Sequence, residues 1–242
     1  MDAIKTVNLT KKYGDLAAVD GLCLTVKKGE LFALLGINGA GKTTTIKMLS
    51  CLTAPTSGDA ILCGKSIIKE SGEVKKLIAV SPQETAVAPK LTVKENLCLM
   101  AGVSGFGKKE TEEKAAAVTV KLGLGSVLSK KAGKLSGGWQ RRLSIAMALI
   151  CEPEVLFLDE PTLGLDVIAR SELWNTIRGL KDNMTIILTT HYMEEAEALS
   201  DRVGIMADGK LKIVGTADEI KSVAGEESFE KAFVKIAKEG AK

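Results

Sequence analysis

Several features that mark other classes of protein are rare or missing in this sequence of 242 residues. The five cysteines are dispersed and form no C-x-x-C pair, which argues against a metal or redox centre and fits reduced thiols in the cytosol. No apolar run approaches the ~18–20 residues that are needed to cross a bilayer. Residues 1–5 lack the apolar core of a signal peptide. We therefore expect any action at a membrane to depend on a partner.

An excess of charge of one sign is also missing. The 33 basic and 30 acidic residues leave a net charge of +3, and this near balance argues against nucleic-acid binding. Aromatic residues make up only 4% of the chain, and there is a single histidine, His191. With 45% hydrophobic and 26% charged residues, the composition is that of a globular protein long enough to bury a full core.

The order of the apolar segments indicates an α/β fold with a largely parallel sheet. Strand-like and helix-like segments alternate along the chain, and residues 155–158 and 185–189 are continuous apolar runs typical of buried parallel strands. Residues 91–150 are mostly helix-like and interrupt this alternation. We therefore predict a helical subdomain at about residues 90–150, inserted into the core.

Shorter patterns predict individual elements inside that insertion and on either side of it. Strands are expected at 60–63 and 77–80, and helices at 93–101, 109–122 and 140–150. Asp208-Gly209 lies between two apolar stretches and predicts a hairpin. Thr216 and Glu219 have capping-box spacing. A last helix is expected to pack through Phe229, Phe233 and Ile236.

The most specific motif is a phosphate-binding loop at residues 36–43. Its sequence, Gly36-Ile37-Asn38-Gly39-Ala40-Gly41-Lys42-Thr43, fits G-x-x-x-x-G-K-[ST] at every position. An apolar strand-like run precedes it and a helix-like segment follows. The glycines let backbone N–H groups surround a phosphate, Lys42 can reach the outer phosphates, and the Thr43 hydroxyl can hold Mg²⁺. The alternative is a Gly-rich turn without function, and the agreement of motif and flanks favours the phosphate site.

Four further polar residues follow predicted strands. Residues 155–158 lead into Asp159, which could bind Mg²⁺, and Glu160, which could orient an attacking water. His191 follows the strand 185–190, at the carboxyl end where α/β folds bind ligands, and Gln83 could reach the metal or its water. Each also has a plain alternative: Asp159 and Glu160 could be an exposed strand end, His191 a structural histidine and Gln83 a loop residue. The phosphate loop in the same sequence is what favours a functional role for them.

A second anion site is predicted where residues 135–142 open a helix that continues through residues 143–150. Ser136 is expected to be its N-cap, and Gly137 and Gly138 leave the helix start bare. A capped helix after a flexible turn is the alternative. A small ATPase needs a second site for the γ-phosphate only if a second molecule contributes it.

Together these elements resemble the ATP-binding cassette (ABC) family over nearly the whole chain and in the family's order. The matching segments are Tyr13 (the aromatic that stacks on adenine), 36–43 (Walker A), Gln83 (Q-loop), 135–139 (signature), 155–160 (Walker B), 164–166 (D-loop) and His191 (switch histidine). Two positions depart from the pattern. Trp139 stands where the signature usually has Gln, and Leu163-Gly164 stands where the D-loop commonly begins with Ser.

The resemblance implies a role for each matched residue. Glu160, His191 and Lys42 would be catalytic, and Thr43, Gln83 and Asp159 would hold Mg²⁺. The residues expected to bind ATP are Tyr13, Gly36, Ile37, Asn38, Gly39, Ala40, Gly41, Lys42, Thr43, Thr44, Gln83, Ser136, Gly137 and Gly138.

The resemblance also implies a fold and a function. The fold would be a P-loop NTPase, with a RecA-like core of mostly parallel strands and an N-terminal antiparallel β region, and residues 1–242 would form a single ABC ATPase domain. Residues 39–49 and 189–197 resemble the bacterial and archaeal branch that exports drugs, antibiotics, lipids or sodium through a separate permease. The chain would then hydrolyse ATP as a dimer, with itself or a homologous cassette. It would be cytoplasmic, bound to the cytoplasmic face of the cell membrane through that permease.

Two other functions share part of this pattern. A soluble ABC ATPase acting on ribosomes or DNA usually has two cassettes, a coiled-coil insertion or a basic surface, and this sequence has none of them. A small-molecule kinase would share the phosphate loop but leave residues 136–138 and His191 without a role. The transported substrate cannot be read from the sequence, because in this architecture the membrane subunit selects it. Export rather than import rests on the resemblance alone.

Overall fold

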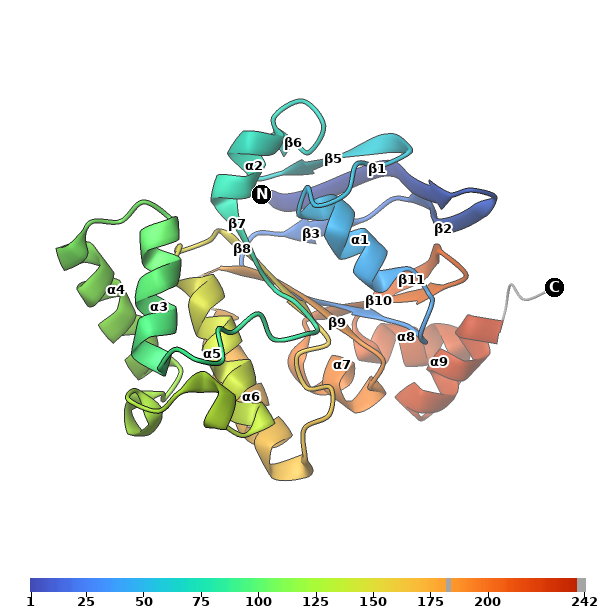
Figure 1. The fold of residues 1–242 in the computed structure, drawn as a ribbon. Helices are drawn as coiled ribbons and strands as arrows, with labels where there is room; N and C mark the ends of the chain where they lie inside the picture. Colours follow the sequence, from blue (N-terminus) through green and yellow to red (C-terminus); the bar gives the residue numbers. More distant parts are fainter. Residues whose placement is uncertain (182–183, 239–242) are drawn as a thin grey trace.

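The computed structural model describes residues 1–181 and 184–238, in which two β-sheets are packed with helices (Figure 1). The larger sheet has the order β11-β10-β4-β9-β8-β7, and all neighbouring pairs are parallel except β10 and β11. Its strands are β4 (Leu31–Leu35), β7 (Ile78–Ser81), β8 (Val155–Asp159), β9 (Thr185–Thr190), β10 (Arg202–Ala207) and β11 (Lys210–Gly215). The predicted largely parallel sheet is confirmed.

The central strands of this sheet bring four loops to one edge. Every residue of β4, β8 and β9 is buried, as their continuous apolar runs predict for strands covered on both faces. Because the strands are parallel, their carboxyl ends meet: Leu35 pairs with Thr190, and Asp159 pairs with Thr189. The segments after β4, β7, β8 and β9 therefore begin side by side, at the edge where open α/β sheets bind ligands.

The second sheet is antiparallel and is formed mostly by the N-terminal segment, as predicted. It contains β1 (Asp2–Tyr13), β2 (Leu16–Leu22), β3 (Thr25–Lys27), β5 (Ser57–Leu62) and β6 (Lys65–Ser66). Helix α1 (Lys42–Leu49) contacts both this sheet and the larger one, and one hydrophobic cluster joins them. Tyr13, at the end of β1, is thereby brought close to the phosphate loop.

The predicted helices between 91 and 150 are confirmed, with small shifts at their ends. They are α3 (Val93–Val103), α4 (Lys108–Lys121) and α5 (Gly137–Leu149), with 3₁₀ turns η1 (Gly125–Val127) and η2 (Ala132–Lys134) between α4 and α5. They lie together at one side of the molecule (Figure 1). They share a hydrophobic cluster with the large sheet, which includes Leu97 of α3, Leu143 of α5 and Leu156 of β8.

Some elements differ from the prediction. Helix α2 (Ser71–Leu77) was not predicted, and Leu77 ends this helix instead of beginning the strand β7. Only Val74 of this short helix is buried, so the sequence has no apolar stripe that would reveal it. The strand expected at 60–63 begins earlier, at Ser57.

The C-terminal predictions are confirmed. Asp208 and Gly209 form the two-residue turn between β10 and β11, both with φ in the left-handed region at 52° and 73°. Helix α8 (Ala217–Ala224) begins with both hydrogen bonds of a capping box between Thr216 and Glu219. In α9 (Phe229–Lys238) the three predicted apolar residues are buried. Within residues 1–181 and 184–238, none of the helices has the length and apolarity that a membrane span requires.

Candidate functional site

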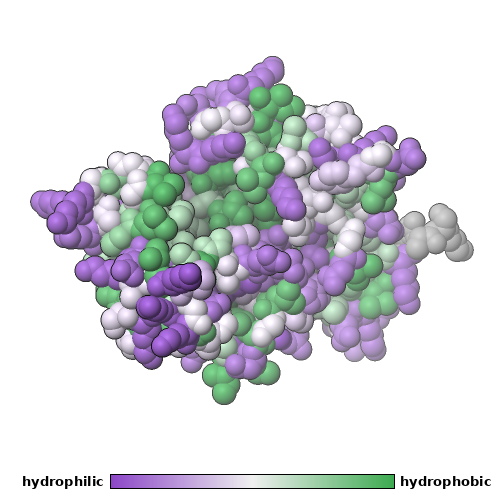
Figure 2. Space-filling view, in the orientation of Figure 1, coloured by the Kyte–Doolittle hydropathy of each residue, from purple (hydrophilic) through white to green (hydrophobic). Residues whose placement is uncertain are grey.

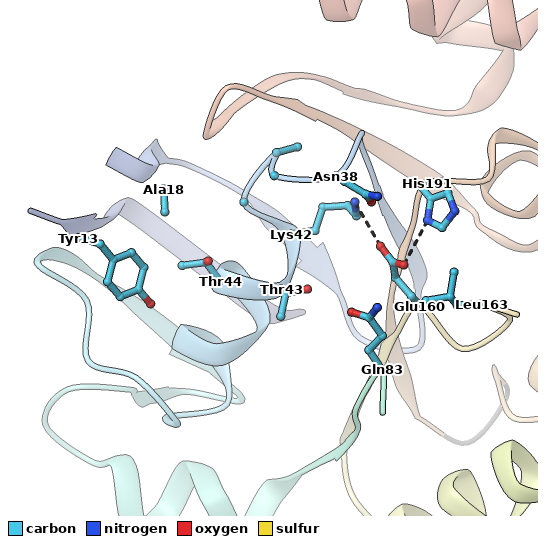
Figure 3. Close-up of a pocket in the computed structure, with 13 residues that line it drawn as sticks. Tyr13, Ala18, Asn38, Lys42, Thr43, Thr44, Gln83, Glu160, Leu163 and His191 are labelled. Atoms are coloured by element: carbon cyan, nitrogen blue, oxygen red, sulfur yellow. Dashed lines mark hydrogen bonds and ion pairs between the residues drawn. The ribbon is translucent and has the colours of Figure 1, made fainter. Parts of the chain in front are cut away.

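A cavity of about 540 Å³ lies at the edge of the large sheet where the four loops meet (Figure 3). It is lined by Tyr13, Ala18, Asn38, Gly39, Ala40, Gly41, Lys42, Thr43, Thr44, Gln83, Glu160, Leu163 and His191. Most of the predicted nucleotide-binding residues are therefore brought together. Tyr13 is half exposed and lies at one end of the cavity, whereas Glu160 and His191 lie at the other.

The phosphate loop owes its shape to its glycines. Gly39 and Gly41 have φ of 83° and 101°, a conformation that other residues rarely adopt. A Cβ atom on Gly41 would lie 2.3 Å from the carbonyl oxygen of Ala18, so only glycine fits there. Gly36 does not line the cavity; its lack of a Cβ lets the loop pass against the carbonyl oxygen of Met206 on β10. The Ile37 side chain is 58% exposed and also stays outside the cavity lining.

Lys42 is buried at the base of this loop. Its Nζ donates hydrogen bonds to the carbonyl oxygens of Gly36 at 2.7 Å and Ile37 at 3.1 Å. The same atom lies 3.5 Å from Glu160 Oε1. Burial lowers the pKa of Lys42, and the neighbouring carboxylates of Glu160 and Asp159 oppose that shift. The loop and the two carboxylates together hold a cation at the floor of the cavity.

Glu160 lies between the two other residues predicted to be catalytic. Its Oε1 faces Lys42, and its Oε2 lies 3.2 Å from Nδ1 of His191 (Figure 3). Its backbone φ is +46°, a strained value for a non-glycine residue, which costs about 1–3 kcal/mol. Its backbone N–H donates to the carbonyl and hydroxyl oxygens of Thr189, which hold this turn. The turn aims a buried carboxylate into the cavity directly after β8.

The residues predicted to hold a metal also lie together. The Thr43 hydroxyl donates to Asp159 Oδ1 at 3.2 Å, and the Gln83 side chain extends toward the same side of the cavity (Figure 3). A hydroxyl, one carboxylate and an amide oxygen are hard oxygen ligands, which suit Mg²⁺ when substrate phosphates and water complete its shell. Residues 1–181 and 184–238 contain no group of three or more His, Cys, Asp or Glu side chains placed to hold a metal. The residues present therefore fit Mg²⁺ that is bound together with a nucleotide.

Two residues that support the site were not predicted from the sequence. Arg141 on α5 is 4% exposed and donates hydrogen bonds to the carbonyl oxygens of Pro82 at 2.6 Å and Gln83 at 2.5 Å. Burial lowers its pKa, although Asp159 opposes that shift. Thr189 donates to Asp159 Oδ1 at 2.5 Å. Neither residue stands out in the sequence: Thr189 is one of three threonines in β9, and Arg141 is one of two adjacent arginines at the start of α5.

The segment Ser136–Gly138 does not contribute to this cavity. Ser136 occupies the N-cap position of α5, as predicted, but its side chain makes no capping hydrogen bond, which corrects the expected side-chain cap. A capping hydrogen bond is the usual reason for a serine at an N-cap, and the Ser136 hydroxyl does not make one here. Trp139, which departs from the expected signature, packs against the hydrophobic cluster, with its ring 5.3 Å from the Arg142 guanidinium.

The fold and the cavity together define a P-loop nucleotide-binding protein with a separate glycine-rich helix start. Residues 19–163, more than half of the chain, match the family model described as ABC transporter. The chain belongs to this family, as its motifs predict.

Relatives and solved structures agree with that assignment. The probable multidrug ABC transporter ATP-binding protein YbhF of Escherichia coli (strain K12) is 39% identical over 239 residues, which cover 96% of this chain and 41% of YbhF. The daunorubicin/doxorubicin resistance ATP-binding protein DrrA of Streptomyces peucetius is 41% identical over 224 residues, covering 92% of this chain and 68% of DrrA. This chain thus spans less than half of the length of YbhF. Both relatives fit the predicted branch of drug exporters.

A solved dimer of the ATP-binding cassette MJ0796, in a post-hydrolysis state bound to ADP and phosphate, has the same fold. It superimposes with a TM-score of 0.78 at 26% identity, covering 88% of this chain and 98% of that one. The predicted P-loop NTPase fold is therefore confirmed.

Proposed function

We propose that this chain is the ATP-binding and ATP-hydrolysing subunit of an ABC transporter, which drives export of a substrate through a separate permease. The observation that carries the proposal is the cavity in which Lys42, Glu160 and His191 converge beside a phosphate loop. The names of YbhF and DrrA, both ATP-binding proteins connected with drugs, support the same function.

The geometry supports direct attack of water on the γ-phosphate of ATP. The loop amides and Lys42 would bind the phosphates, while Tyr13 would stack on the adenine. Glu160, buried and directed into the cavity, would accept a hydrogen bond from the water and orient it, and His191 would hold that carboxylate and stabilise charge on the γ-phosphate. Phosphoryl transfer needs mainly such positioning and charge stabilisation. Mg²⁺ held by Thr43, Asp159 and Gln83 would neutralise charge on the phosphate oxygens.

We infer that the working unit is a head-to-tail dimer with this chain or a homologous cassette. Ser136–Gly138 presents helix-start N–H groups and a hydroxyl, but lies outside the cavity of its own chain. An ATP molecule on residues 36–43 of one subunit would be closed by this segment of the other. The dimeric post-hydrolysis structure of MJ0796 supports the dimer. Charge repulsion between the products would then open the dimer.

Dimer formation should depend on bound ATP. With Glu160→Gln to prevent turnover, ATP and Mg²⁺ are expected to convert the purified protein from monomer to dimer, and ADP is not. Light scattering after size-exclusion chromatography would measure the mass. A monomeric mass with saturating ATP would contradict the inferred dimer and favour a kinase-like use of the phosphate loop.

The permease is expected to contact the side of the molecule near α3. Figure 2 shows hydrophobic surface over this helix, where Leu99 and Val103 are 48% and 74% exposed. Gln83 lies in the segment between β7 and α3, so a change at the nucleotide can be passed to this surface. We propose that a cytoplasmic helix of the permease binds between Gln83 and α3. The chain would thus lie in the cytoplasm, peripheral to the cell membrane. The helices at about residues 90–150 would belong to the same single domain and would move with the permease.

Charge reversal on this surface should uncouple this chain from the permease. Glu84→Lys and Lys94→Glu, both at exposed positions, are expected to leave basal ATP hydrolysis unchanged. Both should weaken binding to vesicles that contain the partner permease. Glu112→Lys on α4, an exposed position outside the segment between Gln83 and α3, serves as the control. Fully coupled transport by both variants would contradict the proposed contact.

The same vesicles test the alternative of a soluble cassette acting on ribosomes or DNA. Recruitment of the protein to permease-containing vesicles, and not to ribosomes, is expected. The opposite preference would replace the transporter proposal.

A further inference from the structure

Three buried polar atoms without hydrogen-bond partners belong to residues at one junction behind the catalytic residues. Among the described residues, the side-chain atoms that are buried and unpaired are Thr162 Oγ1, Arg170 Nε and Glu195 Oε2. They come from the loop after β8, from α6 (Val167–Arg178) and from α7 (Met193–Leu199). Buried polar groups in proteins are nearly always paired, so three unpaired atoms at one junction require an explanation.

Glu195 is at the centre of this junction. Its side chain is fully buried, and Trp174 Nε1 donates a hydrogen bond to Oε1 at 3.0 Å. Arg170 lies one turn before Trp174 on α6, but its guanidinium stacks over the Tyr192 ring, 4.5 Å from the centroid. In the described part of the chain, no salt bridge joins Glu195 to any cation. An ionised carboxylate would therefore be buried here without a salt bridge, which is unfavourable.

The surroundings of Glu195 favour the protonated form. Burial raises its pKa, and the hydroxyls of Thr190 and Thr162, the Trp174 N–H and the Arg170 charge oppose that shift only in part. The charged groups that act on it are Arg170 on α6 and Arg141 on α5. A neutral acid fits these neighbours, because its Oε2–H can donate to a hydroxyl oxygen such as Thr162 Oγ1.

This junction lies directly behind two catalytic residues. Thr162 follows Glu160 by two positions, and α7 begins two positions after His191. The relative position of the Glu160 and His191 side chains, now 3.2 Å apart, therefore depends on how these two loops are joined. We propose that Glu195 is a positioning residue, a neutral carboxylic acid that joins the loop after β8 to the loop after β9 and so holds Glu160 beside His191. The inference rests on the proposed hydrolytic function.

The test compares a neutral isostere with a truncation. Glu195→Gln keeps the shape, the acceptor and a donor, so its ATP turnover is expected to stay within about threefold of the parent. Glu195→Ala should lower kcat by ~10–100-fold, since misplacement of reacting groups by an ångström has effects of that size. Its Kd for ATP should not change, because the loop 36–43 is untouched. Glu194→Gln, an exposed neighbour on the same helix, is the control and should behave as the parent.

An infrared measurement tests the protonation state without relying on activity, and so remains valid if Glu195→Ala fails to fold. The difference spectrum between the parent and Glu195→Gln at neutral pH is expected to show the C=O stretch of a protonated carboxylic acid, lost in the variant. A carboxylate band in its place would overturn the proposal. An equal loss of turnover in Glu195→Gln and Glu195→Ala, or no loss in either, would overturn it as well. A parent protein that does not hydrolyse ATP would contradict the proposed function, while the infrared result would still decide the state of Glu195.

Discussion

Replacement of Glu160 by glutamine is expected to lower ATP turnover by ~10²–10³-fold, the usual effect of losing one preorganised electrostatic group. Glutamine fills the same space after β8 but cannot accept a proton or orient water as a carboxylate does. The Lys42 ammonium and the phosphate loop stay in place, so the affinity for ATP should be retained. The Glu160 carboxylate contacts both Lys42 and His191, so it links the two other residues predicted to be catalytic.

The measurement is a steady-state assay of phosphate release combined with a binding titration with ATP. Glu112→Gln removes an exposed carboxylate on α4 and is the matched control, with turnover equal to the parent. Turnover close to the parental rate in Glu160→Gln would show that another group orients the water. A parallel loss of ATP binding would point to disruption of the cavity in place of a catalytic defect.

The second large effect is expected from changes at either half of the shared site. Lys42→Ala removes the cation that faces the phosphates, so both ATP binding and turnover should fall, the latter by at least ~10²-fold. Ser136→Ala should leave ATP binding to the monomer unchanged, because Ser136 lies outside the cavity of its own chain. It should nevertheless lower turnover and the stability of the ATP-bound dimer. Ser126→Ala, in the η1 turn, provides a hydroxyl-to-methyl control outside the motif and should behave as the parent.

The fold was predictable because local patterns agreed with the tertiary structure. Residues 155–158 form a continuous apolar run because β8 is covered on both faces, and Asp208-Gly209 forms a turn because its two residues tolerate positive φ. The meeting of Lys42, Glu160 and His191 was also predictable, since parallel strands end at one edge of a sheet.

The supporting residues could not be predicted in the same way. Arg141 is separated from Pro82 by 59 positions, and no local pattern indicates that its guanidinium holds that loop. Glu195 stands in an acidic helix start that resembles a solvated surface, and its burial comes from tertiary contacts such as that with Trp174 of α6. Helix α2 was missed for a related reason: a helix with one buried residue leaves little periodicity in the sequence.

The dimer is the central element of this account, and mixing two defective proteins tests it most directly. Lys42→Ala and Ser136→Ala should each be nearly inactive alone. In a hybrid pair, one composite site would contain both defects, whereas the other would combine an intact Lys42 with an intact Ser136 of the partner copy. The account predicts that mixing restores ATP turnover, up to about one working site per hybrid. A mixture no more active than the sum of its components, or full turnover by the parent protein at concentrations where it is monomeric, would contradict it.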